Sequence, residues 1–187
     1  MKLSTSLYIL AFLLITGCGN NAALDQASAA DLVSNYLKSN PVYETEKIDL
    51  GTIKFKSNAD QDEMAKFKEL DSKGYVAMEL QEQKKKFLSR DSTYFYLVKL
   101  TDKAKPYIIK QEQNKATLKV MGYELDEDQP ATLDKAGNKT AKVTIMLKKV
   151  QNAFSVFYKD KNTGSSFITK TYKLKYSKEA GWAVTGD

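Results

Sequence analysis

The sequence contains no histidine at any of its 187 positions. Histidine is the usual general base near neutral pH, and it is the commonest protein ligand of zinc. Its absence excludes hydrolases that pair a serine or cysteine nucleophile with histidine, and it excludes zinc sites built on histidine. We therefore expect a protein that is not an enzyme, and we assign no catalytic residue.

Cysteine is almost as scarce, because Cys18 is the only one in the chain. A single thiol rules out an intramolecular disulfide, so the folded chain must be stabilised by the burial of apolar side chains. The hydrophobic fraction of 42% is sufficient for a packed core. We expect no bound metal ion and no cofactor.

Arginine occurs once, as Arg90, although the formal net charge is +6. Bidentate recognition of phosphate or carboxylate groups usually recruits arginine, whereas dispersed lysines more often solubilise a surface. We interpret the charge chiefly as a solvated surface, with attraction to anionic lipid headgroups or polysaccharide as the alternative. No nucleic-acid partner is expected.

The N-terminal apolar run is short. Leu7–Leu14 falls well below the ~20 residues of a membrane-spanning helix, and it lies between Lys2 and the motif Ile15-Thr16-Gly17-Cys18. A basic start, a short apolar stretch and small residues before a cysteine together resemble the signal peptide and lipobox of bacterial lipoproteins.

This resemblance implies that residues 1–17 are a removed signal peptide and that Cys18 becomes the lipidated first residue of the mature chain. Two or three acyl chains hold a protein stably on a bilayer. We therefore expect a membrane anchor in the bacterial cell envelope. Gly19 stands where enterobacterial lipoproteins retained in the inner membrane carry aspartate. The likeness thus favours the outer membrane, facing the periplasm, if the cell is Gram-negative.

Three segments are expected in the mature chain: a lipidated tether at 18–27, an α+β module at 28–112 and an antiparallel β module at 113–187. Ser28 is the predicted N-cap of a first amphipathic helix, and Asp60 with Glu63 forms the capping box of a second one. A short β-prone stretch, 48–55, lies between the two helices. Strands at Tyr75–Leu80 and Tyr94–Leu100 are predicted to pair as a hairpin.

The order of these elements over residues 28–110 resembles the winged-helix fold of bacterial repressors. Asp60–Lys73 would take the place of the DNA-reading helix, but its first turn is acidic and would repel phosphates. The likeness therefore implies topology without DNA binding. The alternative is a single curved sheet around the N-terminal helices, as in cystatin-like or nuclear-transport-factor-like folds, which commonly enclose a ligand pocket. Both alternatives are α+β folds.

From Ala116 onward the apolar residues recur with a period of two. The alternation runs through 141–147, 154–158 and 168–176, and a final strand carries Trp182 and Val184. This pattern predicts an antiparallel sheet with one buried face.

Two groups of residues are candidate contact sites. The first lies between the hairpin strands, where lysines and an arginine surround two apolar residues; as a partner or membrane contact we expect Lys84, Lys85, Lys86, Phe87, Leu88 and Arg90. The alternative is that Phe87 and Leu88 fold back onto the hairpin or extend a strand, while the lysines are only solvated.

The second group consists of tyrosines on predicted strands, which serve either as stacking platforms or as half-buried core residues. These are Tyr75, Tyr94, Tyr96, Tyr123, Tyr158, Tyr172 and Tyr176. Asp126-Glu127-Asp128 is interpreted as an acidic turn, because it lacks the alternating ligands and the glycine of a calcium loop.

The sequence thus predicts a lipid-anchored protein of the bacterial cell envelope with a non-catalytic binding or scaffolding role. Its expected partners are the membrane, through Cys18, and an envelope protein or glycan. The alternative function is small-molecule or glycan binding in a pocket of a curved sheet.

Replacing the lipidated thiol tests the anchor. The Cys18→Ser variant should be released from the membrane fraction, because serine cannot accept the thioether-linked lipid that holds the wild type there. Cell fractionation and the mass of the mature chain measure the outcome. Continued sedimentation of Cys18→Ser with the bilayer, or a wild-type mass without acyl chains, would contradict the assignment.

Overall fold

The computed structural model describes residues 23–85, 91–160 and 164–187. Within these ranges the chain has an α+β fold in which every paired strand is antiparallel. The elements are α1 (Gln26–Ser39), β1 (Val42–Asp49), β2 (Gly51–Lys56), α2 (Gln61–Ser72), β3 (Val76–Lys85), β4 (Ser92–Leu100), the 3-10 helix η1 (Asp102–Tyr107), β5 (Ile108–Gln111), β6 (Lys115–Leu125), β7 (Thr132–Lys135), β8 (Thr140–Gln151), the 3-10 helix η2 (Ala153–Phe157), β9 (Phe167–Ser177) and β10 (Gly181–Gly186).

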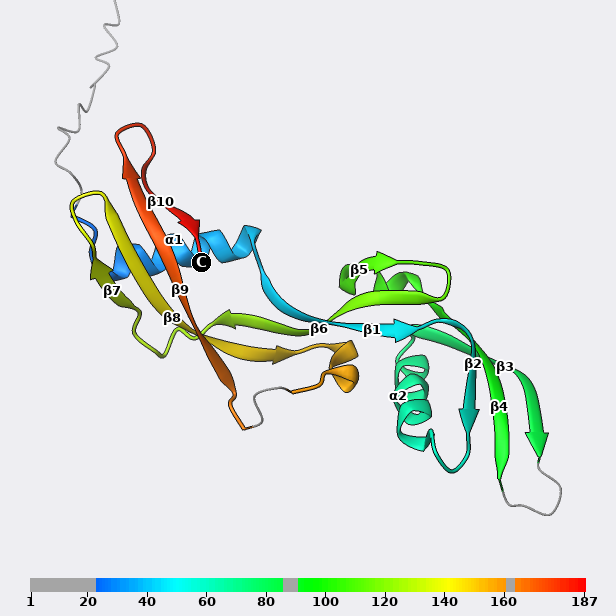
Figure 1. The fold of residues 1–187 in the computed structure, drawn as a ribbon. Coiled ribbons are helices and arrows are strands. Elements are labelled where there is room, and N and C mark those ends of the chain that lie inside the picture. The colour runs from blue at the N-terminus through cyan, green and yellow to red at the C-terminus, as the bar shows by residue number, and fades with distance from the viewer. Residues whose placement is uncertain (1–22, 86–90, 161–163) are drawn as a thin grey trace, which may run out of the picture.

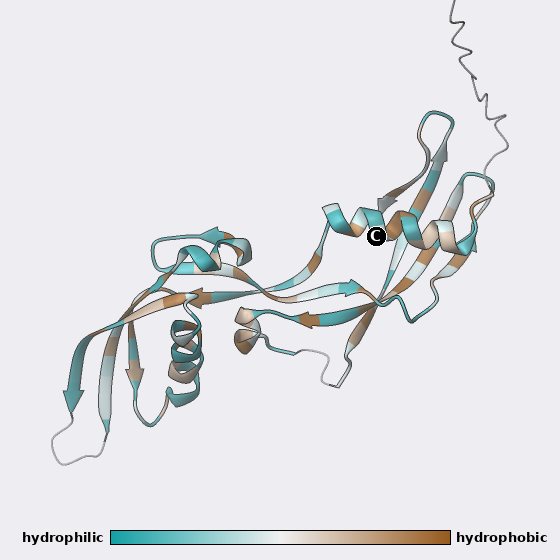
Figure 2. Cartoon of the chain, turned by 180° about the vertical axis from the view of Figure 1, so that it is seen from behind, coloured by the Kyte–Doolittle hydropathy of each residue, from teal (hydrophilic) through white to brown (hydrophobic). Residues whose placement is uncertain are grey.

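The molecule is elongated, with α1 and β7–β10 at one end and α2 with β2–β4 at the other (Figure 1). A seven-stranded, strongly curled sheet has the order β1-β6-β8-β9-β10, with β5 on β6 and β7 on β8. A second sheet has the order β2-β4-β3. The expected alternation of apolar and polar residues is visible along the strands (Figure 2).

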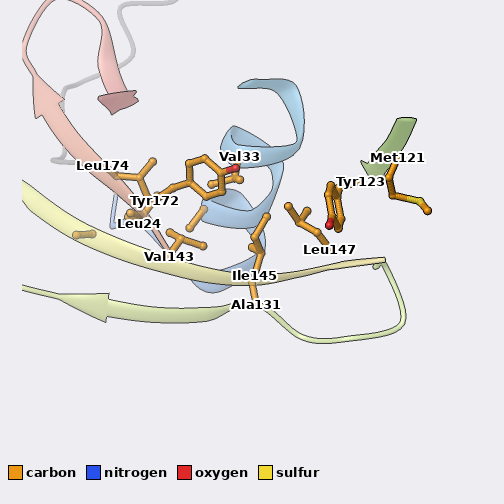
Figure 3. Close-up of a cluster of buried hydrophobic side chains, with 12 residues drawn as sticks. Leu24, Val33, Met121, Tyr123, Ala131, Val143, Ile145, Leu147, Tyr172 and Leu174 are labelled. Carbon is orange, nitrogen blue, oxygen red and sulfur yellow. The ribbon is translucent and has the colours of Figure 1, made fainter. Parts of the chain in front are cut away.

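Each end has its own core. The α1 core packs α1 against β8 and β9 (Figure 3); its buried residues are Leu24, Ala29, Val33, Met121, Tyr123, Ala131, Ala141, Val143, Ile145, Leu147, Tyr172 and Leu174. The α2 core lies between α2, the second sheet and η2; its buried residues are Ile48, Leu50, Phe55, Phe67, Leu70, Val76, Val98, Ala104, Ala116, Leu118, Val120 and Phe154.

A winged-helix module over residues 28–110 is not what the structure shows. α1 packs against β7, β8 and β10, whereas α2 packs against β2, β3 and η2. The two helices that a winged helix would stack together therefore serve different cores. The curved-sheet alternative fits the seven-stranded sheet, and the cores are not separated at residue 112, because β1 pairs along its whole length with β6.

Helix α1 begins earlier than the sequence predicts. Asp25 is its N-cap, and its Oδ1 accepts a hydrogen bond of 2.7 Å from the backbone N–H of Ser28, the predicted cap. This hydrogen bond lowers the pKa of the Asp25 carboxyl group. Leu24 is only 4% exposed and belongs to the α1 core. Residues 24–27, predicted as tether, are therefore part of the fold.

Helix α2 begins after Asp60, as predicted, but without the predicted capping box. The Asp60 side chain makes no cap hydrogen bond; its Oδ2 instead accepts one of 2.7 Å from the backbone N–H of Lys56. The predicted hairpin is confirmed by the pairing of β3 with β4, although β3 continues five residues beyond Leu80 to Lys85.

The period-two pattern is confirmed for β8 and β9 but is wrong for 154–158. Phe154 lies in the 3-10 helix η2, which begins at Ala153, instead of in a strand. Its ring is fully buried and lies against Tyr75 and Tyr107, with centroid separations of 5.7 and 5.5 Å. The apolar residues of this segment are thus buried around a helical turn, which a count of alternating residues cannot reveal.

Strand β6 contributes to both cores because it contains a β-bulge. Glu44 and Thr45 of β1 are opposite Met121 and Lys119, which leaves Val120 without a partner on β1. The extra residue reverses the buried face: Val120 belongs to the α2 core, whereas the next residue, Met121, belongs to the α1 core.

The capping box of η2 also supports this bulge. Asn152 Oδ1 accepts a hydrogen bond from the backbone N–H of Phe154, and Ser155 Oγ accepts one from the backbone N–H of Asn152. The same side chains donate to β6, Asn152 Nδ2 to the Lys119 carbonyl at 3.2 Å and Ser155 Oγ to the Val120 carbonyl at 2.6 Å. Backbone carbonyls at the bulge are thereby hydrogen-bonded.

The position of Phe154 predicts a large loss of stability when its ring is removed. Phe154→Ala should lower the free energy of unfolding by about 3–5 kcal/mol, the range for truncating a buried phenylalanine. Phe167→Ala is the matched control, because Phe167 is 42% exposed, and it should change stability by less than about 1 kcal/mol. Urea denaturation of both variants measures the difference; equal losses would contradict the assigned packing.

Candidate binding groove

Helix α1 carries a second stripe of residues beside its core stripe. Ala27, Ala30, Ser34 and Leu37 recur at helical spacing, so they share one side of the helix. They line two adjoining hollows of about 500 and 670 Å³ that share Ser34, Leu125 and Glu127. We call the two hollows together the α1 trough. It runs along α1 and past the start of β1.

The larger hollow of the α1 trough has a mixed lining. Apolar, aromatic, amide and charged side chains all contribute; the lining residues are Ser34, Leu37, Lys38, Pro41, Val42, Tyr43, Pro106, Tyr107, Lys119, Gly122, Tyr123, Glu124, Leu125, Glu127, Lys148, Val150, Gln151 and Asn152. Its volume lies within the roughly 300–1,000 Å³ usual for ligand pockets.

Gly122 contributes backbone to this lining in the middle of β6. It is opposite Tyr43 on β1 and Val150 on β8. Gly122 is not among the described glycines with positive φ, so turn geometry does not require it. A Cβ at this position would lie 3.5 Å from the Val150 carbonyl oxygen, which is an ordinary contact. Glycine within a strand weakens it and often marks a site where another molecule approaches closely.

Tyr43 provides an accessible aromatic ring in the α1 trough. It is 38% exposed, and Lys119 Nζ lies 5.0 Å from its ring centroid. Tyr107 contributes a second ring, held edge-on against Tyr75 at 5.9 Å. Burial, followed by the interaction with Tyr75, raises the pKa of the Tyr107 hydroxyl.

The larger hollow is lined by charges of both signs, three lysines and two glutamates. Lys38, Lys119 and Lys148 face Glu124 and Glu127 in the same lining, and Lys148 is directly opposite Glu124 in the sheet. This combination suits a ligand that carries hydroxyl, amide or zwitterionic groups better than one of high net charge.

A chain of polar side chains lies behind the trough and links the two halves of the molecule. The Tyr123 and Tyr158 hydroxyls interact, and the Tyr158 hydroxyl donates to Asp160 Oδ1 at 3.3 Å. Lys149, with a side chain only 11% exposed, donates to both carboxylate oxygens of Asp160 at 3.0 Å. Tyr158 packs against both cores, so this chain fixes one wall relative to the other.

Among residues 23–85, 91–160 and 164–187, no group of three or more cysteine, aspartate or glutamate side chains is placed to hold a metal ion. Asp126 Oδ1 accepts a hydrogen bond from the backbone N–H of Asp128, as in an acidic turn. The trough therefore presents rings, amides and charges of both signs, which are the components of a non-covalent binding site.

Lys84 and Lys85, the described residues of the predicted contact segment, lie at the far end of the molecule from the α1 trough (Figure 1). Lys84 and Lys85 are the last residues of β3, and Lys84 Nζ lies 5.1 Å from the Phe95 ring and 3.2 Å from Glu82. The other members, Lys86, Phe87, Leu88 and Arg90, are outside the described residues, as is Cys18.

The seven tyrosines predicted on strands do not form one stacking platform, and Tyr75 and Tyr158 lie outside the strands. Tyr123 and Tyr172 are buried, and Tyr158 is packed against both cores. Only Tyr123 contributes to the α1 trough. Sequence reasoning missed Tyr43, Tyr107 and Gly122; a glycine in the middle of the β-prone run 116–125 was the one local signal.

The buried tyrosine predicts a loss of stability in alkali. Burial, then the hydrogen bond to Tyr158, raises the pKa of Tyr123, which is 8% exposed. An unfolded tyrosine loses its proton near pH 10 while the folded one keeps it. The unfolded state then binds fewer protons, so this contribution is complete below about pH 10 and is lost as the pH rises further.

Urea denaturation between about pH 8 and pH 11 should show this decline, and Tyr123→Phe should reduce its slope by up to about 1.4 kcal/mol per pH unit. Comparing slopes separates titration from the hydrogen bond that the variant loses at every pH. Identical slopes for wild type and variant would contradict the assignment.

No helix among the described residues is long and apolar enough to cross a membrane. Comparison of the chain with protein-family models, with curated proteins and with solved structures found no match in any of the three.

Proposed function

We propose that this chain is a lipid-anchored, non-catalytic binding protein of the bacterial cell envelope, and that the α1 trough holds a small molecule or short glycan. The lipobox-like motif ending at Cys18 supports the anchor. The observation that carries the binding role is the trough, which joins two hollows along one helix and has a strand glycine in its lining.

The shape and lining of the α1 trough favour an elongated ligand of mixed polarity. Ala27, Ala30 and Pro130 line its narrower part, and Tyr43 and Tyr107 line the wider part. Sugar rings present apolar CH faces to aromatic rings and hydroxyl groups to amides and charged side chains. A short glycan therefore matches both parts of the lining.

Asn152 forms part of the wall rather than a recognition group. Its amide already donates to the Lys119 carbonyl and accepts from the backbone N–H of Phe154. Gln151, at the exposed end of β8, and Glu124 are placed to hydrogen-bond a ligand. Such a preformed wall reduces the entropy lost on binding.

The β3–β4 hairpin supports a second candidate, contact with an envelope protein. It forms the end of the molecule opposite α1 (Figure 1), so a chain anchored through the residues before α1 presents the hairpin away from its anchor. Lys84 and Lys85 at the end of β3 belong to the contact segment predicted from the sequence. A partner held there would leave the α1 trough accessible.

Filling the trough at its glycine tests the proposal. Gly122→Leu should fold, because the Cβ meets only ordinary contacts, and its side chain should occupy part of the binding volume. Envelope-derived glycan fragments and small amphiphiles are screened by thermal denaturation. A ligand present at about 100 times its Kd stabilises a protein by roughly 2.7 kcal/mol, so it should raise the wild-type Tm by several degrees.

Gly122→Leu should lose this shift for the same compound. The control is Thr169→Leu, an exposed strand position that does not line the trough, which should retain the wild-type shift. A shift retained by Gly122→Leu would place the ligand elsewhere, and no shift with any compound in the panel would contradict the proposed binding role.

A further inference from the structure

The described chain enters the fold at the end of the molecule formed by the β7–β8 and β9–β10 turns. α1 packs against β7, and Lys135, the last residue of β7, lowers the pKa of the Asp25 carboxyl group, after the larger effect of the Ser28 hydrogen bonds. A hydrogen bond of 2.8 Å from the backbone N–H of Tyr176, next to the last residue of β9, to the Lys139 carbonyl joins the β7–β8 turn to the end of β9, where the β9–β10 turn begins. Residue 24 and both turns therefore lie at one end of the fold.

Lysines gather at this end. Six exposed lysines lie in the two turns, at the end of β7 and on the outer face of β8 and β9, and we call them the basic end: Lys135, Lys139, Lys142, Lys173, Lys175 and Lys178. None of them takes part in the side-chain ion pairs formed within the described ranges. Lys173 Nζ donates only to the Asp187 backbone carbonyl, at 3.4 Å.

Acidic residues at this end do not balance the lysines. The Asp25 side chain caps α1, Asp134 is opposite Lys142, and Glu179 lies in the β9–β10 turn. Asp187, which lies beside Lys173, is paired with Lys170, so that pair adds no net charge. Three further carboxylates accompany the six ammonium groups, which leaves a net positive surface.

The register of the sheet brings like charges together. Lys142 on β8 is directly opposite Lys173 on β9, and Lys175 follows on the same face of the sheet. Like charges directly opposite one another in a sheet are destabilising. A surface that keeps such a pair together is complementary to anions, which would relieve the repulsion.

The tether is too short to move this end far from its anchor. Cys18 precedes Leu24 by six residues, and a chain of that length spans at most about 20 Å. Leu24 is buried in the α1 core, so residues from Leu24 onward add nothing to the length of the tether. Acyl chains on Cys18 would hold the fold within that distance of the headgroups.

We propose that the basic end docks on the anionic phospholipid headgroups of the bilayer in which the chain is anchored. The docked orientation rests on the proposed lipidation of Cys18, but the affinity of the lysines for anionic headgroups does not. Docking orients the molecule with the β3–β4 hairpin pointing away from the membrane and limits tumbling about the tether.

The test uses the mature chain with Cys18→Ser, which carries no lipid and so isolates the surface from the anchor. Its sedimentation is measured with vesicles of phosphatidylcholine alone and with vesicles of equal amounts of phosphatidylcholine and phosphatidylglycerol. The wild-type surface should bind only the mixed vesicles, and rising salt should weaken binding, because it screens charges.

Two variants of equal charge separate a specific surface from general basicity. In the first, four lysines of the basic end are changed: Lys139→Gln, Lys142→Gln, Lys175→Gln and Lys178→Gln. In the second, four exposed lysines of the opposite half, each without a side-chain ion pair among the described residues, are changed: Lys54→Gln, Lys56→Gln, Lys68→Gln and Lys99→Gln.

The first variant should bind mixed vesicles at least tenfold more weakly, since each lysine near an anionic surface contributes roughly fivefold, and the second should bind like the wild type. The proposal would be overturned by equal losses of binding in both variants. It would also be overturned if the unaltered surface bound neutral vesicles as strongly as mixed ones, or did not bind mixed vesicles at low salt. A wild-type chain found without acyl groups would contradict the anchor alone, because the sedimentation result does not depend on it.

Trp182 reports the orientation in the lipidated chain. It is the only tryptophan, and it is directly opposite Tyr176 in the β9–β10 hairpin, with ring centroids 5.7 Å apart. Lipids brominated near the headgroup should quench its fluorescence in mixed vesicles and less in neutral ones. Equal quenching in both would contradict docking through the basic end.

Discussion

The extra residue in β6 is the constraint on which the architecture depends. Val120 has no partner on β1, so the buried face of β6 changes between Val120 and Met121. A regular strand would direct one face toward one core along its whole length. With the bulge, a single strand closes the α2 core with its first half and the α1 core with its second half, and the two ends of an elongated molecule share a continuous backbone.

The bulge is held by the segment that follows β8. Asn152 and Ser155 cap η2 and at the same time bond the Lys119 and Val120 carbonyls. Their neighbour Phe154 fills the α2 core. The polar chain from Tyr123 through Tyr158 to Asp160 and Lys149 continues this support along the same region. The wider part of the α1 trough lies beside these contacts, so its walls are positioned by the junction between the cores.

The arrangement also separates the surfaces that the proposals assign. The basic end lies where the described chain enters the fold, the α1 trough runs along the side of α1, and the β3–β4 hairpin forms the opposite end (Figure 1). A chain docked at the basic end would therefore keep both its trough and its hairpin accessible. Each surface can be altered without changing the others, because they share no residue.

The sequence by itself determined the α+β class, the helical segments, the paired strands β3 and β4, and the alternating faces of β8 and β9, because these depend on local periodicity. It also excluded histidine chemistry and disulfides. Only the tertiary structure decided which core each helix joins, since the apolar stripe of α1 fits any complementary face. It also placed 154–157 in a 3-10 helix and left Tyr43 exposed while Tyr172 is buried. The sequence could not predict the trough for the same reason. Gly122, Tyr43 and Tyr107 are distant in sequence, and strand pairing and a bulge bring them together.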